Sequence, residues 1–416
     1  MVDDPAYRLP STVKPERYDL ELEPDLEAST FTGSETVVVT VEEPTRELVV
    51  NSLELEIRDV SLQDPAGRTL EGSVTYNEQE QQATFTFGEE LKPGSGYRLQ
   101  LSFGGSLGGK LQGFYRSTFA GPDGVEQLIA STQFEPTDAR RAFPCWDEPA
   151  FKAVFSVSLV VPDGLAAFSN GKEISSEELV GKRRVRFADT IPMSTYLVAF
   201  VVGPFETSSE RDVAGVRLRI AAAPGKSDLT AFAGEAGEHA VSFLAGYFDI
   251  PYPGDKLDHV AIPDFSFGAM ENLGCVTYRE SALLTNPNRA SQLELQRVAT
   301  VVAHETAHMW FGDLVTMKWW NGIWLNEAFA TFMELLTTDD FRQDWDVWTG
   351  FAAGKSAAMV TDGLRATRPI EFPVGRPEEA EAMFDLLTYQ KGGAVLRMLE
   401  QFLGPEAFRK GIGHYL

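Results

Sequence analysis

Short runs of alternating β-branched and aromatic residues fill the first half of this chain, and they constrain its fold more than any other feature. Alternation with a period of two residues places apolar side chains on one face of a strand and polar side chains on the other. Turn residues (Pro, Gly, Asn and Asp) separate the runs, of which examples are Glu35–Val41, Ala83–Phe87, Tyr97–Leu101 and Phe155–Leu159. From about residue 18 to residue 202 the chain predicts a large antiparallel β sandwich or saddle-shaped sheet.

The pattern changes after Gly203 and Pro204, where apolar residues begin to recur at helical spacing. Helices are predicted over 228–248, 292–311, 326–336 and 392–402. A chain of 416 residues that is 43% hydrophobic can bury two cores. We therefore predict an α+β multidomain protein, with a β domain over 1–205 and a mainly helical domain over 206–416.

The net charge and the few cysteines limit the partners that the protein can bind and the cell compartment in which it is expected. The chain has 36 basic and 61 acidic residues, and its net charge of −25 argues against nucleic acid and anionic membrane surfaces as partners. Cys145 and Cys275 are far apart and outside any C-x-x-C pattern, so neither a disulfide framework nor a cysteine zinc site is predicted. The first residues lack the pattern of a secretory signal, and the longest apolar stretch, Tyr196–Val202, is shorter than the roughly 20 residues that span a bilayer. We expect a soluble, cytoplasmic protein, unless a mature form has lost its signal.

The segment His304–His308 reads H-E-T-A-H and lies inside a predicted helix. Residues four positions apart share one face of a helix, so His304 and His308 can offer two imidazoles to one ion. H-E-x-x-H is a zinc metalloprotease motif, in which the glutamate, here Glu305, is the general base. Zinc in catalytic sites takes three protein ligands and keeps one position for water. One Zn²⁺ per chain is predicted.

The third zinc ligand is expected to be Glu327, which opens the next helical pattern 19 positions after His308. Glu334 lies two turns further along that helix and is either a hydrogen-bond acceptor for a ligand histidine or a solvated carboxylate. The remaining histidines, His239, His259 and His414, have no such context and are interpreted as surface or packing residues.

These residues predict hydrolysis of a peptide bond. A zinc ion lowers the pKa of a bound water to near 7 and polarises a carbonyl. Glu305 would take the proton from that water as it attacks the peptide carbonyl, and would pass the proton to the leaving amine.

Nearly the whole chain resembles the zinc aminopeptidases related to aminopeptidase N and the puromycin-sensitive aminopeptidase, often called gluzincins. The resemblance runs from Leu9–Tyr18 through Pro192–Phe200 to Tyr389–Gly392, and it is most specific at G-A-M-E-N, Gly268–Asn272. It implies a thermolysin-like catalytic domain after the β domain. The substrates it implies are peptides with a free amino terminus.

The resemblance also assigns roles to residues outside the zinc motif. Glu271 matches the family glutamate that binds the substrate's α-amine, and Glu135, in Q-F-E-P, matches a second amine-binding carboxylate from the β domain. Two carboxylates around an ammonium would reject internal peptide segments. Tyr389 matches the tyrosine that donates to the oxyanion, although a tyrosine before a helix is more often a packing residue. The other substrate-binding positions implied are Gly268, Ala269, Met270, Asn272, Gln133 and Phe267.

The sequence departs from the family pattern in two ways. Gly322 and Ala328 replace an acidic residue and a Gly or Ser that are common in relatives, and neither change removes a proposed ligand. Family members also continue into further C-terminal domains, whereas this chain reads as an N-terminal portion of a longer enzyme.

Three alternatives to the aminopeptidase remain. A catalytically silent peptide-binding or scaffold fragment is one. An epoxide hydrolase activity is another, but Glu135 and the residues around Glu271 favour the peptidase. Endopeptidase action is the third, and the two amine anchors argue against it.

Overall fold

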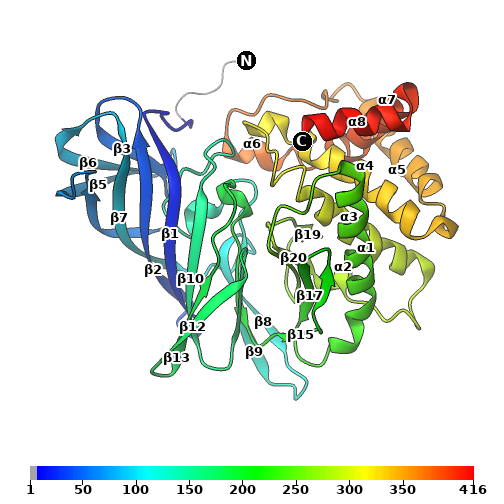
Figure 1. Cartoon of the computed structure of the whole chain (residues 1–416), viewed down its shortest axis with the longest axis horizontal. Coiled ribbons are helices and arrows are strands. Elements are labelled where there is room, and N and C mark those ends of the chain that lie inside the picture. The colour runs from blue at the N-terminus through cyan, green and yellow to red at the C-terminus, as the bar shows by residue number, and fades with distance from the viewer. Residues whose placement is uncertain (1–6) are drawn as a thin grey trace. The chain divides into compact units, whose positions relative to one another are not determined.

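The computed structural model describes residues 7–416, and its contacts divide the chain into two compact units. The first covers 7–205 and the second covers Glu206–Leu416. Figure 1 shows strands in the first half of the chain and helices through most of the second, so the predicted α+β fold class is confirmed. Residues 1–6, on which the absence of a signal segment was partly judged, lie outside the described residues.

The larger sheet of the first unit has ten strands in the order β12-β13-β10-β1-β2-β7-β4-β5-β6-β3. All neighbours pair antiparallel except β1 and β10, which are parallel. The antiparallel sheet predicted from alternation is therefore confirmed with one exception. The strands are β1 Val13–Asp25, β2 Thr30–Val41, β3 Thr45–Asn51, β4 Glu56–Gln63, β5 Thr69–Asn77, β6 Gln82–Leu91, β7 Gly94–Ser106, β10 Val154–Pro162, β12 Glu173–Leu179 and β13 Lys182–Phe187.

A four-stranded sheet in the order β11-β14-β9-β8 completes the first unit. Its strands are β8 Gly113–Ala120, β9 Glu126–Gln133, β11 Ala166–Ser169 and β14 Phe200–Gly203. Aromatic rings fill the core of the unit: Tyr18 stacks on Phe155 at 4.8 Å between centroids, and Phe143 contacts Phe134 and Phe200 edge to face. Edge-to-face contacts suit the ring quadrupoles and add to the free energy of burying the rings.

The second unit begins with a mixed sheet that the sequence reading did not predict. Its order is β15-β17-β18-β20-β19, with β16 beside β17, and β17, β18 and β20 run parallel. Every residue of β18 is buried, so the strand shows no alternation. Its charged residues are neutralised internally, because Asp258 pairs with Lys256 at 2.8 Å and with Arg219 at 2.6 Å. The strands are β15 Glu206–Thr207, β16 Arg211–Val213, β17 Val216–Ala222, β18 Lys256–Ile262, β19 Ala269–Met270 and β20 Cys275–Arg279.

Helices make up most of the rest of the second unit. The four predicted helices correspond to α1, α3, α4 and α7, and α3 packs against both α1 and α4. A π-helical turn at Leu387–Lys391 runs directly into α7. The helices are α1 Ala231–Phe248, α2 Glu280–Leu283, α3 Gln292–His308, α4 Trp324–Phe341, α5 Val347–Asp362, α6 Pro377–Glu381, α7 Gly392–Leu403 and α8 Pro405–Tyr415.

Two further observations concern the cysteines and the helices of residues 7–416. Cys145 and Cys275 are free and buried. Within this part of the chain, no helix combines the length and the apolar character that crossing a bilayer requires.

The buried ion pair of Arg140 and Asp147 generates a prediction about the stability of the first unit. Arg140 Nε donates to Asp147 Oδ2 at 2.9 Å, and both side chains are at most 3% exposed. Removing one partner leaves the other charge buried and unpaired, which typically costs about 3–5 kcal/mol. We expect Asp147→Ala to lower the free energy of unfolding by about that amount in urea titrations.

Glu56→Ala is the matched control, because it breaks an ion pair with Arg58 whose side chains are 68% and 58% exposed. Exposed pairs contribute less than about 1 kcal/mol. Equal effects of the two substitutions would contradict a structural role for the buried pair.

Candidate metal centre and active site

The helix that carries the H-E-T-A-H segment is fixed at its first turn. Ser291 is its N-cap: Glu294 N donates to Ser291 Oγ at 3.3 Å, and Ser291 N donates to Glu294 Oε2 at 2.8 Å. This reciprocal arrangement is a capping box, and it satisfies two backbone donors at the helix start. Val298 and Val302 are buried, so one face of α3 packs into the core. This packing sets which way the other side chains of α3 point.

His304 and His308 lie one turn apart at the end of α3, and their imidazoles converge. Their Nε2 atoms are 3.0 Å apart, and His308 is 1% exposed. Glu327, in the first turn of α4, brings Oε2 within 3.3 Å of His304 Nε2 and 3.4 Å of His308 Nε2. Two nitrogens and one carboxylate oxygen from two packed helices therefore form a nearly equilateral triangle.

This triangle fits a zinc ion in size and in donor type. Ligands about 2.0–2.1 Å from a tetrahedral zinc ion lie about 3.3 Å from one another, which agrees with the three separations. The side chains of His308 and Glu327 are 1% and 3% exposed and that of His304 is 12% exposed, so little water can solvate the three donors. We therefore take His304, His308 and Glu327 as the candidate ligands, the set that the sequence predicted.

The outer nitrogens of both imidazoles already have acceptors. His304 Nδ1 lies 2.6 Å from Glu334 Oε2, and His308 Nδ1 lies 2.9 Å from the carbonyl oxygen of Phe311. If each Nδ1 carries the proton, each Nε2 presents its lone pair to the centre of the triangle. Of the two interpretations of Glu334, the structure therefore favours the acceptor over the solvated carboxylate.

The carbonyl of Phe311 is a contact that sequence reasoning missed, because backbone atoms leave no residue-type signal. Gly312 follows it with φ of 131°, a conformation that L side chains rarely adopt. A Cβ at Gly312 would lie 3.4 Å from His308 Nδ1, an ordinary contact, so the positive φ and not a lack of space favours glycine here. In the sequence, only Gly312 directly after Phe311 indicates a turn at this position.

The cluster holds protons tightly when no cation is present. Burial lowers the pKa of His308, but the carboxylates of Glu271 and Glu327 outweigh burial and raise it to about 9. Burial raises the pKa of Glu327, but the two histidines lower it to about 2. Burial likewise opposes the charged form of His304, and Glu334 and Glu327 raise its pKa well above the usual value. A bound cation would have to displace these protons.

Glu305 lies between the two histidines on α3 and is 6% exposed. Burial raises its pKa to about 8, although His304 and His308 act in the opposite direction. A carboxylate whose pKa has moved toward neutrality suits general acid and base work. A cation beside it would favour the ionised form and lower that pKa.

Glu271 follows β19 in a tight hairpin beside the candidate ligands. Its Oε1 is 3.9 Å from His308 Nδ1, the residue is 3% exposed, and burial raises its pKa. Asn272 fixes the hairpin, because its Nδ2 donates to Thr277 Oγ1 at 3.2 Å. Met270 and Asn272 are buried, so their side chains shape this loop, whereas Gly268 is exposed and Ala269 and Phe267 are partly exposed.

Glu135 and Gln133 belong to the first unit. Gln133 ends β9, and its Nε2 donates to the carbonyl oxygen of Glu135 at 3.3 Å. Glu135 is 7% exposed and Gln133 is 2% exposed. Their predicted roles in binding the substrate remain predictions.

Tyr389 lies in the π-helical turn Leu387–Lys391. Its ring faces that of His304, with centroids 6.0 Å apart and planes 24° from parallel. Gly392 allows the turn to approach α4, because a Cβ there would lie 2.6 Å from Ala328 Cβ. The structure thus places Tyr389 beside a candidate ligand, in a π-helical turn of the kind often found at functional sites.

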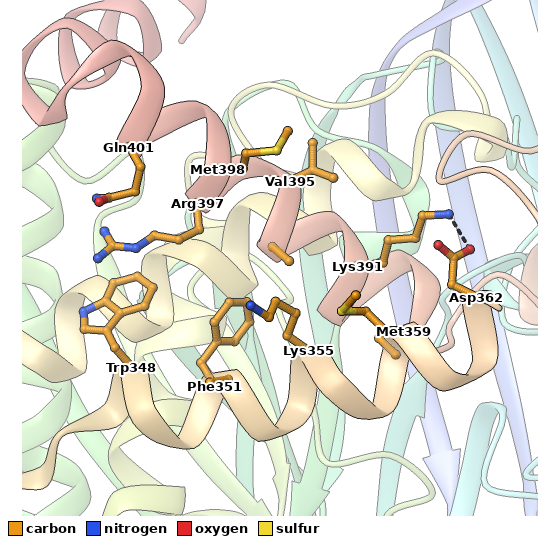
Figure 2. A pocket seen from close by; sticks show the side chains of 13 residues that line it. Trp348, Phe351, Lys355, Met359, Asp362, Lys391, Val395, Arg397, Met398 and Gln401 are labelled. Carbon is orange, nitrogen blue, oxygen red and sulfur yellow. Dashed lines mark hydrogen bonds and ion pairs between the residues drawn. The ribbon is translucent and has the colours of Figure 1, made fainter.

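The other histidines of the second unit are separate from the cluster. His259 is fully buried, with Nδ1 2.8 Å from Tyr278 Oη, and His239 pairs with Asp340 at 3.1 Å on the surface. A pocket of about 610 Å³ between α5 and α7 is lined by Trp348, Phe351 and Met398 among others, and contains none of the candidate site residues (Figure 2).

Two protein-family models match most of the chain. Residues 14–197 match the peptidase M1 N-terminal domain, and residues 232–416 match the peptidase family M1 domain. The chain therefore belongs to the peptidase M1 family.

Several relatives share this similarity along 98% of the chain. It is 44% identical to Aminopeptidase M1 of Arabidopsis thaliana and covers 47% of that protein. It is 42% identical to the puromycin-sensitive aminopeptidase of Caenorhabditis elegans and 40% identical to endoplasmic reticulum aminopeptidase 1 of Homo sapiens, and it covers 44% of each. The chain thus spans slightly less than half the length of these relatives.

The ligand set predicts a ranked effect of substitutions on zinc affinity. Glu327→Gln replaces a charged donor in the triangle, whereas Glu334→Gln changes only the acceptor for His304 Nδ1. Loss of such an outer acceptor typically costs about 10- to 100-fold in metal affinity, and loss of a ligand should cost more. Competition titrations against a zinc chelator measure both.

Asp340→Asn on the same helix serves as control, because that side chain is 50% exposed and pairs with His239. Its zinc affinity should equal that of the unaltered chain. Unchanged affinity in Glu327→Gln would remove Glu327 from the ligand set.

Zinc binding should be linked to proton release. With its pKa at about 9, His308 carries a proton at pH 7 in the metal-free protein, and a ligand imidazole must be neutral. Zinc affinity should therefore rise with pH at least up to that pKa, and it should fall as the solution becomes more acidic, because the raised pKa of His304 acts in the same direction. Calorimetric titrations in buffers of different ionisation enthalpy should show net proton release at pH 7, and an affinity independent of pH between 6 and 9 would contradict the assigned cluster.

Proposed function

We propose that this chain carries the catalytic centre of a zinc-dependent aminopeptidase, which removes the first residue from peptides with a free amino terminus. One observation carries the proposal. His304, His308 and Glu327 form a zinc-sized triangle of donors, and the buried carboxylate of Glu305 stands on the same helix between the two histidines.

The metal would act as a Lewis acid, and a protein side chain would act as the general base. When bound, a zinc ion supplies a Lewis acid that polarises a carbonyl oxygen and makes water more acidic. Glu305 then serves as general base: its carboxylate takes a proton from the attacking water and returns the proton to the nitrogen of the leaving amine.

Glu271 supports the restriction to amino termini. Its carboxylate lies beside His308, in the hairpin that Asn272 and Thr277 fix. A carboxylate held at a set distance from the reacting centre binds an ammonium and leaves an internal peptide bond out of register. Glu135, in the first unit, remains the predicted second carboxylate for this ammonium.

Tyr389 is the proposed hydrogen-bond donor to the oxyanion. Its ring faces the imidazole of His304 with centroids 6.0 Å apart, which supports a role for the phenol as a hydrogen-bond donor to the substrate. A phenol that donates to the developing oxyanion can stabilise the transition state by about 3 kcal/mol. The relatives named as aminopeptidases support the same activity, although this chain spans less than half of each.

Glu305→Gln separates catalysis from metal binding. Gln keeps the shape of the side chain but is not a base, so we expect turnover of an aminoacyl p-nitroanilide to fall by about 10²- to 10⁴-fold while zinc stays bound. Glu235→Gln, an exposed substitution on α1, should leave both unchanged.

Unchanged turnover in Glu305→Gln would remove this residue from the mechanism. An N-acetylated substrate tests the amine anchor: resistance to hydrolysis is expected, and rapid cleavage would indicate an endopeptidase. Bound zinc without any turnover in the unaltered chain would favour the alternative of a silent peptide-binding fragment.

A further inference from the structure

The turn that carries Tyr389 is held in place by a cation from elsewhere in the second unit. Arg368 lies between α5 and α6, and its side chain is 10% exposed. Its Nη2 lies 2.6 Å from Asp385 Oδ1, 2.8 Å from Thr388 Oγ1 and 3.1 Å from the carbonyl oxygen of Met383. All three partners precede Tyr389 by no more than six residues, so the guanidinium is directed at the approach to the turn.

Asp385 relays this contact into the backbone of the turn. The oxygen that pairs with Arg368 also accepts hydrogen bonds from Leu387 N at 2.9 Å and Thr388 N at 3.1 Å. Charge-assisted bonds of this kind are about twice as strong as neutral ones. The cation therefore orients the carboxylate, and the carboxylate orients the two residues before Tyr389.

A second ion pair holds the far end of the turn. Lys391 Nζ donates to Asp362 Oδ1 at 2.7 Å, at one end of the pocket between α5 and α7 (Figure 2). The same ammonium lies 3.3 Å from the carbonyl oxygen of Arg368. Arg368 and Lys391 thus tie one loop to both ends of the five-residue turn.

The backbone of the turn explains why such support is needed. Lys391 N donates to the carbonyl oxygen of Leu386 at 3.1 Å, a bond across five residues that defines the π form. Single π turns are uncommon and occur mostly as local insertions at functional sites. The bonds from Tyr389 N to Asp385 O and from Gln390 N to Leu386 O span four residues, so the π form lies where the turn meets α7. A purely α-helical path would change the rotation of the residues before Lys391, Tyr389 among them, relative to α7.

We propose that Arg368 and Asp385 are positioning residues for Tyr389, and that they act by holding the π-helical turn so that the phenol faces the metal ligands. This inference rests on the proposed function for its kinetic test, since Tyr389 is there the oxyanion donor. The positioning itself is a statement about the ring of Tyr389 and has a test that needs no turnover.

The kinetic test is a double-mutant cycle. Arg368→Gln should lower kcat about 10- to 100-fold, because a misplacement of about 1 Å in a catalytic group can cost that much, while KM changes little. If Arg368 acts through Tyr389, the same substitution should have almost no further effect in a Tyr389→Phe background. Asp385→Ala should behave like Arg368→Gln in both backgrounds.

Arg365→Gln is the control, since Arg365 is an exposed arginine in the same loop. It should leave kcat unchanged. An equal loss from Arg368→Gln with and without the Tyr389 phenol would overturn the inference, because it would indicate a general loss of structure. No loss in the Tyr389-containing background would overturn it as well.

The second test observes Tyr389 directly by NMR of ring-labelled tyrosine, with its signal assigned by disappearance in Tyr389→Phe. The signal should shift in Arg368→Gln and Asp385→Ala and stay in place in Arg365→Gln. An unmoved signal in the first two variants would overturn the inference. If the unaltered chain has no turnover, the proposed function fails for this chain while this spectrum still decides whether Arg368 positions Tyr389.

Discussion

The second unit depends on the contact between the end of α3 and the start of α4, where two imidazoles and one carboxylate lie within 3.4 Å of one another and are at most 12% exposed. Polar groups this deeply buried are costly unless they are paired or coordinate a cation. The capping box of α3, the turn at Gly312 and the outer acceptors of both histidines each reduce the freedom of that cluster. These contacts hold the three donors in the converging arrangement.

Separate structural elements hold the remaining site residues around this contact. A short hairpin presents Glu271, the register of α3 presents Glu305, and a π-helical turn presents Tyr389. Each element is held by hydrogen bonds outside the candidate ligands. Asn272 bonds to Thr277 in the hairpin, Ser291 to Glu294 at the start of α3, and Arg368 to Asp385 before the π-helical turn. The candidate catalytic groups can thus be altered one at a time, which makes the proposed roles separable by mutation.

Sequence reasoning predicted the parts of this arrangement that have a strong local signal. Alternation predicted the β-rich first unit, and helical spacing predicted α3, α4 and the convergence of His304 with His308. The sheet of the second unit was missed because β18 is buried on both faces and carries a charged pair inside, so it shows neither alternation nor a purely apolar run. Phe311 and Arg368 were missed for a different reason: one acts through its carbonyl, and the other acts on residues 15 to 20 positions away, a separation that no local pattern encodes.

The most direct measurement is X-ray absorption at the zinc edge on the purified, zinc-loaded chain. We predict two imidazole ligands and oxygen for the rest of the first coordination sphere, at about 2.0–2.1 Å, with an imidazole signature that weakens when His304 or His308 is replaced by alanine. Sulfur at about 2.3 Å, or a spectrum unaffected by those substitutions, would place the metal elsewhere and contradict the assigned ligand set.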